Sequence, residues 1–193
     1  MITKKQLTGV ILAGGQSRRM GQNKALLSLK GQSFLERIAG VLAPLVQEVV
    51  VVDNGALAEH WAGTLWGDNY PHQGPVAGIE TALSQLSTSH ALVVGCDFPL
   101  LQAAPLTYLL QQSQPYQSTI FSLAGRWQPL VGVYAQAQHS YFEKALQQQQ
   151  LKLLAVLQAL PLQVCPCPVQ WSQQLSNINT LEAYQQLLDD FEH

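Results

Sequence analysis

An α/β fold of three layers, with helices on both faces of a mainly parallel sheet, is predicted by two patterns in the sequence. Short runs of β-branched and apolar residues alternate with longer stretches in which apolar residues recur at helical spacing. The runs 48–52 (EVVVV) and 91–96 (ALVVGC) are almost continuously apolar, which is typical of strands buried on both faces. Because no linker, repeat or change of composition divides the 193 residues, we expect a single domain over 1–193.

The expected strands are short apolar runs that end in turn residues. The first, Thr8–Leu12, ends in Ala-Gly-Gly, and the second ends at Asp53-Asn54-Gly55, a sequence typical of turns. The weakest is the three-residue run 65–67, and two later strands flank a turn at Gly125-Arg126. In chain order, the expected strands are 8–12, 48–52, 65–67, 91–96, 119–123, 130–134 and 163–167.

The expected helices combine one apolar face with a recognisable first turn. Ser33, followed by Glu36 three residues later, forms a capping box at the start of the first helix. Pro105 occupies the favoured first turn of the third helix, and Thr180 or Asn179 can cap the last. In chain order, the expected helices are 33–45, 76–86, 105–112, 141–149, 151–160 and 181–191.

The composition excludes several classes of function. The chain is 47% hydrophobic and 11% charged, and its net charge of −2 does not support nucleic-acid binding, which needs a basic face. No apolar run approaches the ~18 residues of a membrane span, and the apolar stretch near the N-terminus is too short for a signal peptide. We therefore expect no membrane partner and a cytoplasmic location.

The three cysteines are too few for a disulfide framework, and Cys165-Pro-Cys167 lacks the second pair that a structural zinc site needs.

Half of the basic residues lie close together in the sequence. Five of the ten fall within residues 18–37, namely Arg18, Arg19, Lys24, Lys30 and Arg37. A local group of cations on a mildly acidic protein favours a small anionic ligand. Parallel sheets bind ligands beyond the carboxyl ends of their strands, and this rule selects the segment 13–24, the pair Asp53-Asn54, and Asp97.

The segment 12–24 (LAGGQSRRMGQNK) brings glycines and cations together directly after the first strand. Gly14 and Gly15 allow the backbone to approach a ligand closely. The segment is not a P-loop, because Ala25 stands where Ser or Thr would bind magnesium, and Gln16 stands where the GxGxxG pattern needs its second glycine. We interpret the segment as a phosphate-binding loop, with a solvated basic loop as the alternative.

Asp97, in the stretch Cys96-Asp97-Phe98-Pro99, follows a buried strand. Mg²⁺ binds one or two protein carboxylates and completes its shell with phosphate oxygens and water. Asp97 is therefore a candidate Mg²⁺ ligand, and the alternative is a helix cap or turn residue.

Three further segments indicate an anionic ligand less specifically. The segment 74–78 (GPVAG) opens a helix whose N–H groups and dipole favour an anion, or it forms a plain tight turn. Arg126 beside Trp127 suits a phosphate next to a flat ring, or it belongs to a surface hairpin. In the segment 177–180 (NINT), the asparagine that does not cap the last helix is available for other hydrogen bonds.

Taken together, these blocks resemble the molybdenum cofactor guanylyltransferase family. LAGGQSRRMGQNKALL resembles the family signature almost position for position, and GPVAGI, CDFPLL, RWQPLVGVY and NINT resemble four later blocks in the same order. The resemblance spans residues 8–182. It implies a Rossmann-like αβα nucleotidyltransferase fold. It also implies Mg²⁺-dependent transfer of GMP from GTP to the phosphate of Mo-molybdopterin.

The resemblance also implies roles for individual residues. Lys24 would contact a phosphate, assisted by Arg18 or Arg19, and Asp97 would contact both the nucleotide and the metal. Asn54 matches the family's nucleoside contact better than its neighbour Asp53. In full, the implied GTP-binding residues are Leu12, Ala13, Gly14, Gly15, Lys24, Asn54, Asp68 and Asp97, and the implied catalytic residues are Asp97, Lys24 and Arg19.

The chain departs from the family pattern at two places. The turn 179–182 (NTLE) lacks a proline, and Lys152 stands where the family often has an arginine on a late helix, which weakens the assignment of a pterin contact there. The implied partners are GTP and Mo-molybdopterin, with other cofactor-biosynthesis proteins or molybdoenzyme chaperones as further candidates. The alternative functions are a cytidylyltransferase, a sugar-phosphate nucleotidyltransferase, or a GTP-binding protein without catalysis.

Overall fold

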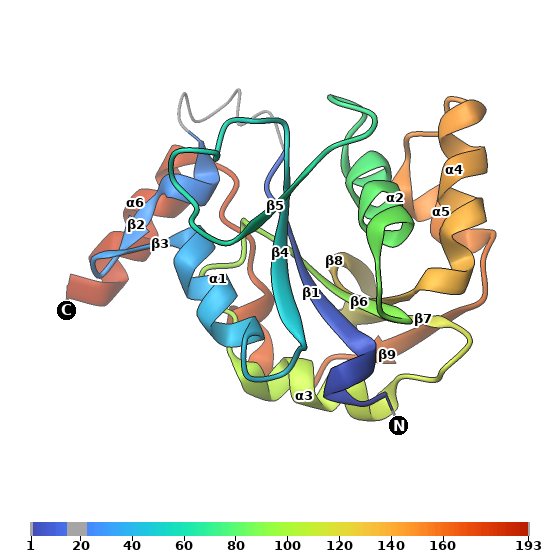
Figure 1. Ribbon diagram of the computed structural model, residues 1–193. Helices are drawn as coiled ribbons and strands as arrows, with labels where there is room; N and C mark the ends of the chain where they lie inside the picture. Colours follow the sequence, from blue (N-terminus) through green and yellow to red (C-terminus); the bar gives the residue numbers. More distant parts are fainter. Residues whose placement is uncertain (1, 15–22, 193) are drawn as a thin grey trace.

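A seven-stranded sheet forms the centre of the protein (Figure 1). The structure is a computed structural model, and it describes residues 2–14 and 23–192. The strand order across the sheet is β5-β4-β1-β6-β8-β7-β9. In chain order the strands are β1 (Leu7–Leu12), β4 (Glu48–Asp53), β5 (Thr64–Gly67), β6 (His90–Gly95), β7 (Ser118–Leu123), β8 (Arg126–Ala135) and β9 (Leu162–Pro166).

The sheet is mainly parallel, as predicted. β1 pairs in parallel with β4 and β6, β4 pairs in parallel with β5, and β7 pairs in parallel with β9. β8 is antiparallel to both β6 and β7, so it alone runs against the other strands of this sheet. The carboxyl ends of β5, β4, β1 and β6 therefore lie next to one another at one edge.

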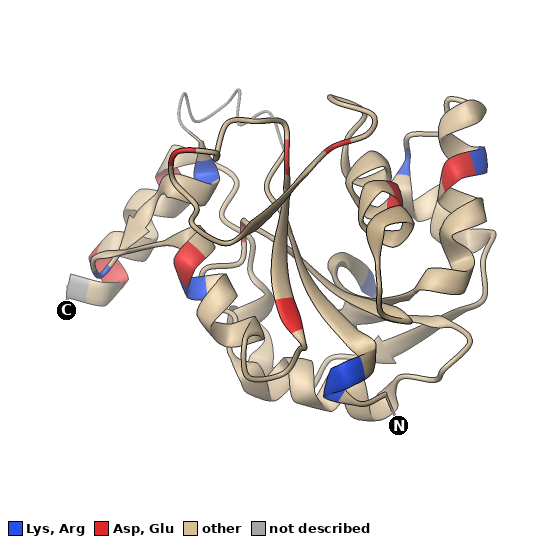
Figure 2. Cartoon of the chain, in the orientation of Figure 1, with Lys and Arg blue, Asp and Glu red and all other residues tan. Residues whose placement is uncertain are grey.

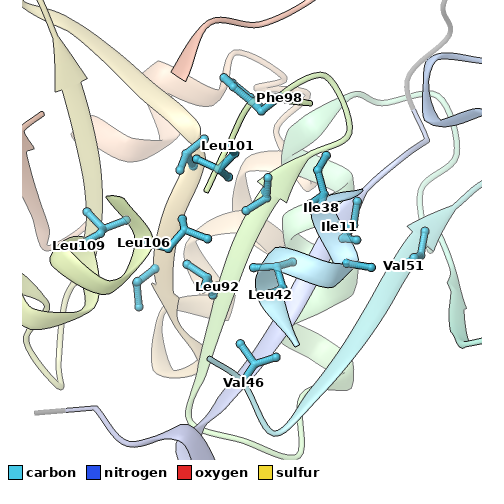
Figure 3. Close-up of a cluster of buried hydrophobic side chains, with 14 of the residues drawn as sticks. Ile11, Ile38, Leu42, Val46, Val51, Leu92, Phe98, Leu101, Leu106 and Leu109 are labelled. Atoms are coloured by element: carbon cyan, nitrogen blue, oxygen red, sulfur yellow. The ribbon is translucent and has the colours of Figure 1, made fainter. Parts of the chain in front are cut away.

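Helices cover both faces of the sheet, which confirms the three-layer α/β prediction (Figure 1). Successive residues of a strand point to opposite faces, and the core divides accordingly. Ile11 of β1 packs in one cluster, with side chains of α1 and α3 (Figure 3). Its neighbour Val10 packs in the other cluster, with side chains of α2, α4 and α5. The helices are α1 (Phe34–Leu42), α2 (Pro75–Gln85), α3 (Ala103–Gln112), α4 (His139–Gln147), α5 (Leu153–Gln158) and α6 (Leu181–Glu192).

Some predicted boundaries are wrong, for local reasons. Helix α1 ends at Leu42 rather than at residue 45, because Pro44 has no N–H with which to continue the helix. The turn between β7 and β8 lies at Ala124-Gly125, where both residues have positive φ (48° and 76°), as two-residue hairpin turns require. Residues 126–129, expected to lie between two strands, therefore form the start of β8.

A third, smaller cluster joins residues 27–34 to the C-terminal part of the chain. The hairpin of β2 (Ser28–Leu29) and β3 (Gln32–Ser33), whose two-residue strands are too short to predict from sequence, packs with α6 (Figure 1). The Tyr184 hydroxyl donates to the carbonyl of Ser28 at 2.7 Å, and its ring meets Phe34 edge to face with centroids 5.8 Å apart. Among the described residues, no helix is long and apolar enough to cross a membrane.

Candidate functional site

The carboxyl ends of four parallel strands bring most of the predicted site residues to one edge of the sheet. Leu12 at the end of β1 is level with Val52 of β4 and Gly95 of β6, and Val52 is level with Trp66 of β5. The residues that follow these strands are therefore neighbours in space although they are far apart in sequence. They are Ala13 and Gly14 after β1, Asn54 after β4, Asp68 after β5 and Asp97 after β6.

Asp97 is held in a short turn after β6. Its carbonyl accepts a hydrogen bond from the N–H of Ile178 at 2.8 Å, and its carboxylate forms a hydrogen bond with the side chain of Asn177. The carboxylate lies over Gly95, where an added Cβ would stand 2.7 Å from Asp97 Oδ1. The buried side chain of Phe98 anchors the turn in the core (Figure 3). Glycine is thus required at position 95 to leave space for the carboxylate.

Burial dominates the electrostatics of Asp97. It raises the pKa of this carboxyl group above its ordinary value, although the positive charge of Lys24 and the hydrogen bond from Asn177 act in the opposite direction. The same burial, with the charge of Asp97 as the second cause, raises the pKa of the Cys96 thiol to about 12, so Cys96 is not a nucleophile at neutral pH. Lys24 is close enough to act on both groups. A further positive charge at this position would favour the ionised form of Asp97.

Lys24 lies in the N-terminal half of the chain but is hydrogen-bonded to a residue of the C-terminal segment. It begins a single 3₁₀ turn that Asn23 caps by accepting the N–H of Ala25 at 3.1 Å. Its Nζ donates to Oδ1 of Asn179 at 2.5 Å. Thr180, one of the two caps expected for α6, accepts the N–H of Ala183 at 3.2 Å. Both asparagines of the NINT segment are therefore used at the site, Asn177 on Asp97 and Asn179 on Lys24.

Asn54 lies against the glycine that follows β1. Its Nδ2 donates to the carbonyl of Gly14 at 2.8 Å, while its buried Oδ1 has no hydrogen-bond partner within residues 2–14 and 23–192. The neighbouring Asp53 has a different role, because its Oδ2 accepts the N–H of Leu57 at 2.8 Å inside the turn. Of the two candidates from the sequence, the structure places Asn54 at the edge beside Gly14 and commits Asp53 to the turn.

Helix α2 begins close to the same edge. Gly74 precedes it with a φ of 76°, which only glycine adopts readily, and Pro75 occupies the first turn. At Gly78 an added Cβ would stand 3.1 Å from Leu12 Cδ2, so a glycine here lets the helix approach the end of β1. The GPVAG block thus has a packing role at the end of β1, and the N–H groups of Ala77 and Gly78 donate to the carbonyl of Gly74.

Some predicted site residues are not brought together in the described part of the chain. Gly15, Arg18 and Arg19 lie outside the described residues. Arg37 donates from Nε to the carbonyl of Pro99 at 3.2 Å, so it supports the turn that carries Asp97. Lys30 lies 4.8 Å above the ring of Phe191. Two of the five clustered cations therefore stabilise the fold.

The donor set at this edge suits a metal that takes few ligands from the protein. Among the described residues, no group of three or more His, Cys, Asp or Glu side chains is arranged to hold a metal ion. Asp97 is a single carboxylate whose burial is not fully offset by its neighbours. Mg²⁺ needs only one or two carboxylates when substrate phosphates complete its shell. The residues present therefore fit Mg²⁺ bound together with a phosphate compound.

The sequence and the fold are both similar to known proteins. The family model of a MobA-like NTP transferase domain matches residues 9–163. A probable molybdenum cofactor guanylyltransferase of Carboxydothermus hydrogenoformans is 33% identical over 192 residues, which cover 97% of this chain and 98% of that protein.

Among solved structures, molybdopterin-guanine dinucleotide biosynthesis protein A of Archaeoglobus fulgidus shares the fold, with a TM-score of 0.83 at 22% identity over 96% of this chain and 98% of that one. A manganese complex of Rv0371C from Mycobacterium tuberculosis has a TM-score of 0.69 at 16% identity, over 96% of this chain and 99% of that one. The family model and the Carboxydothermus relative both span most of the sequence. The chain therefore belongs to the MobA-like NTP transferase family and is a nucleotidyltransferase.

Proposed function

We propose that this protein transfers GMP from GTP to the terminal phosphate of Mo-molybdopterin, forming molybdopterin guanine dinucleotide and pyrophosphate. The observation that carries the proposal is the placement of Asp97 and Lys24 at one edge of the sheet, where Asn177 and Asn179 hold them. A carboxylate that can hold a divalent cation, next to a lysine, suits a reaction between two polyanions. The name of the Carboxydothermus relative supports GTP and molybdopterin as the substrates.

The donor nucleotide would bind across the ends of β1, β4 and β5. Asn54 offers a buried Oδ1 that has no partner in the described part of the chain, which suits an N–H or hydroxyl donor of the nucleoside. Asp68 offers a carboxylate at the neighbouring strand end. The backbone would provide the remaining contacts. In this proposal the GTP-binding residues are Leu12, Ala13, Gly14, Gly15, Lys24, Asn54, Asp68 and Asp97.

The chemistry does not require a general base from the protein. The attacking oxygen belongs to a phosphate that is already anionic at neutral pH, so the main barrier is the repulsion between two negatively charged substrates. Lys24, with Arg19, would neutralise the charge that develops on the departing pyrophosphate. Asn179 keeps the Lys24 ammonium group at the edge by accepting its hydrogen bond.

Asp97 would hold Mg²⁺, and Asn177 would orient its carboxylate. When bound, the metal supplies positive charge to the phosphate oxygens. Asp97 follows β6 and Lys24 begins the 3₁₀ turn at 24–26, so the carboxylate that would hold the metal and the lysine would come from different segments of the chain.

A product assay with matched variants tests this proposal. Pyrophosphate and the dinucleotide are measured with Mo-molybdopterin, Mg²⁺ and either GTP or CTP. We expect product with GTP and Mg²⁺ in the unmodified protein and none in Asp97→Asn. Asp53→Asn is the matched control, because this aspartate follows the neighbouring strand but is committed to the turn at Leu57, and it should retain activity.

The other outcomes separate the alternatives. Preference for CTP would identify a cytidylyltransferase, and activity only with a sugar phosphate as acceptor would identify a different nucleotidyltransferase. Tight binding of GTP without release of pyrophosphate would support a binding protein without catalysis. Full activity of Asp97→Asn would remove Asp97 from the proposed metal site.

A further inference from the structure

The loop that follows β5 is held by a hydrogen-bond network that includes the proposed nucleoside contact, Asp68. Asp68 opens this loop, and its N–H donates to the carbonyl of Asp53 at 3.1 Å. Its Oδ1 accepts two hydrogen bonds, from the N–H of Tyr70 at 2.9 Å and from the Thr81 hydroxyl at 3.2 Å. Among the described residues, Oδ2 has no hydrogen-bond partner. The two oxygens of one carboxylate are therefore used differently.

Thr81 makes two hydrogen bonds with this loop through a single oxygen. It lies on α2 and is fully buried. Its hydroxyl donates to Asp68 Oδ1 and accepts the N–H of Asn69 at 2.9 Å, which uses its one donor and one of its acceptor positions. Thr81 thus fixes both the carboxylate of Asp68 and the backbone of the next residue.

A second layer of polar groups holds Asn69 in turn. Its Nδ2 lies 3.4 Å from Glu80 Oε2 and 3.2 Å from the Ser84 hydroxyl. Glu80 is 3% exposed, and its other oxygen meets Nε2 of His139 at the start of α4, 2.8 Å away. A buried carboxylate is costly unless it is paired, so this arrangement ties the loop to two helices at once.

From this geometry we infer that Thr81 is a positioning residue for the donor nucleotide. It commits Asp68 Oδ1 to the protein and leaves Oδ2 as the acceptor for a hydroxyl or N–H of the nucleoside. The inference rests on the proposed function, in which Asp68 contacts the nucleoside. Because the helix that carries Thr81 also packs on Leu12 through Gly78, the orientation of Asp68 is fixed relative to the end of β1.

A double-mutant cycle tests whether Thr81 acts through Asp68. Equilibrium binding of GTP with Mg²⁺ is measured for the unmodified protein, Thr81→Val, Asp68→Ala and the double variant. We expect Thr81→Val to raise the Kd about tenfold, because it removes a hydrogen bond to a charged group while keeping the side-chain shape. In the Asp68→Ala background the same substitution should change the Kd by less than about twofold, since no carboxylate remains to be oriented.

Two further variants separate positioning from general destabilisation. Thr81→Ser keeps the hydroxyl and should bind GTP within about twofold of the unmodified protein. Thr119→Val is the matched control, because Thr119 is also fully buried but its hydroxyl has no hydrogen-bond partner among the described residues. The Kd of this variant for GTP should be unchanged.

The inference is overturned if Thr81→Val raises the Kd by the same factor with and without the Asp68 carboxylate, or does not raise it at all. It is also overturned if Thr81→Ser loses affinity about tenfold despite its hydroxyl, a result that remains decisive should Thr81→Val fail to fold. If the unmodified protein does not bind GTP, the proposed function fails as well. If it binds GTP but the effects of the two substitutions are additive, only the inference about Thr81 fails.

Discussion

The two edges of the central sheet carry similar polar side chains but pair them differently. At the amino edge, where the parallel strands begin, the hydroxyls of Thr8 and Thr88 lie 2.9 Å apart. The ring of His90 is hydrogen-bonded on both sides, to the Ser89 hydroxyl at 2.8 Å and to the carbonyl of Pro115 at 3.1 Å. These groups satisfy one another within the protein, as buried polar groups in a structural role do.

The next strands repeat this pattern. Ser118 donates to Gln138 Oε1, and Gln138 Nε2 donates to the carbonyl of Pro161 at 2.6 Å. Thr119 is an exception, since its buried hydroxyl has no partner. A neutral hydroxyl without a partner costs less than a charged group in the same position.

At the carboxyl edge the polar groups are only partly satisfied. Asn54 uses its Nδ2 on Gly14, but its buried Oδ1 has no partner among the residues that the structure describes. Asp68 uses one carboxylate oxygen, and burial raises the pKa of Asp97 despite the nearby charge of Lys24. The extent of pairing, rather than the type of residue, therefore distinguishes the carboxyl edge, where we propose that the nucleotide binds, from the amino edge.

The largest effect is expected from Asp97→Asn, which should lower turnover by at least about 10³-fold, because the proposed metal ligand is lost. The same substitution should leave thermal stability at pH 7 unchanged or raised. The folded protein holds a proton on Asp97 more tightly than the unfolded chain, so the ionised carboxylate destabilises the fold at neutral pH. This cost decreases as the pH falls below the folded pKa and is lost below the unfolded pKa. Calorimetry at pH 7 together with a turnover assay checks both parts, and a clear drop in stability would contradict the account.

A smaller effect is expected from Lys24→Ala. Removal of one pre-placed positive group should lower kcat on the order of 10²-fold. Lys30→Ala is the control, since Lys30 contacts Phe191 on α6 and should affect stability more than kcat. Steady-state kinetics with GTP measure both variants, and a loss below about threefold in Lys24→Ala would count against the proposed role.

Asn177→Ala should have a more moderate effect. Its hydrogen bond orients the carboxylate of Asp97, and loss of such a partner commonly costs 10- to 100-fold in metal affinity, so we expect the Mg²⁺ concentration for half-maximal rate to rise about tenfold. The rate at saturating Mg²⁺ should recover most of its original value. An unchanged Mg²⁺ dependence would show that Asn177 has only a structural role.

The smallest effect is expected at the amino edge, and it concerns stability alone. Burial lowers the pKa of His90, so the folded protein favours the neutral ring. The unfolded chain takes up this proton near pH 6.5, and stability is therefore lost as pH falls through that value. Thermal unfolding between pH 7.5 and 5.5 should show a smaller decrease for His90→Gln than for the unmodified protein. If His90→Gln changes the affinity for GTP at pH 7.5, the amino edge affects binding as well as stability, and the distinction between the two edges fails.

The gathering of polar residues at the carboxyl edge could be predicted from the sequence because strand ends are local features. Asn54, Asp68 and Asp97 each follow an apolar run, and a parallel sheet brings such positions together. The same rule could not separate Asp53 from Asn54, because the choice depends on which side chain closes the turn at Leu57.

The contacts made by the C-terminal segment could not be predicted in the same way. Asn177 and Asn179 meet Asp97 and Lys24 only because α6 packs on the hairpin of β2 and β3, through contacts such as Tyr184 with Phe34. No short-range pattern indicates such docking. The buried hydrogen bonds of Thr81 and Glu80 could not be predicted either. Both residues lie within a helix, and the spacing of its apolar residues indicates only which positions are buried.

Hydrogen exchange of the backbone amides, with and without GTP and Mg²⁺, tests the comparison between the two edges most directly. The account predicts slower exchange on binding in the segments that follow β1, β4, β5 and β6, including Gly14, Asn54 and Asp97, and no change around His90 and Gln138. Protection confined to the amino edge, or no protection at saturating GTP and Mg²⁺, would contradict it.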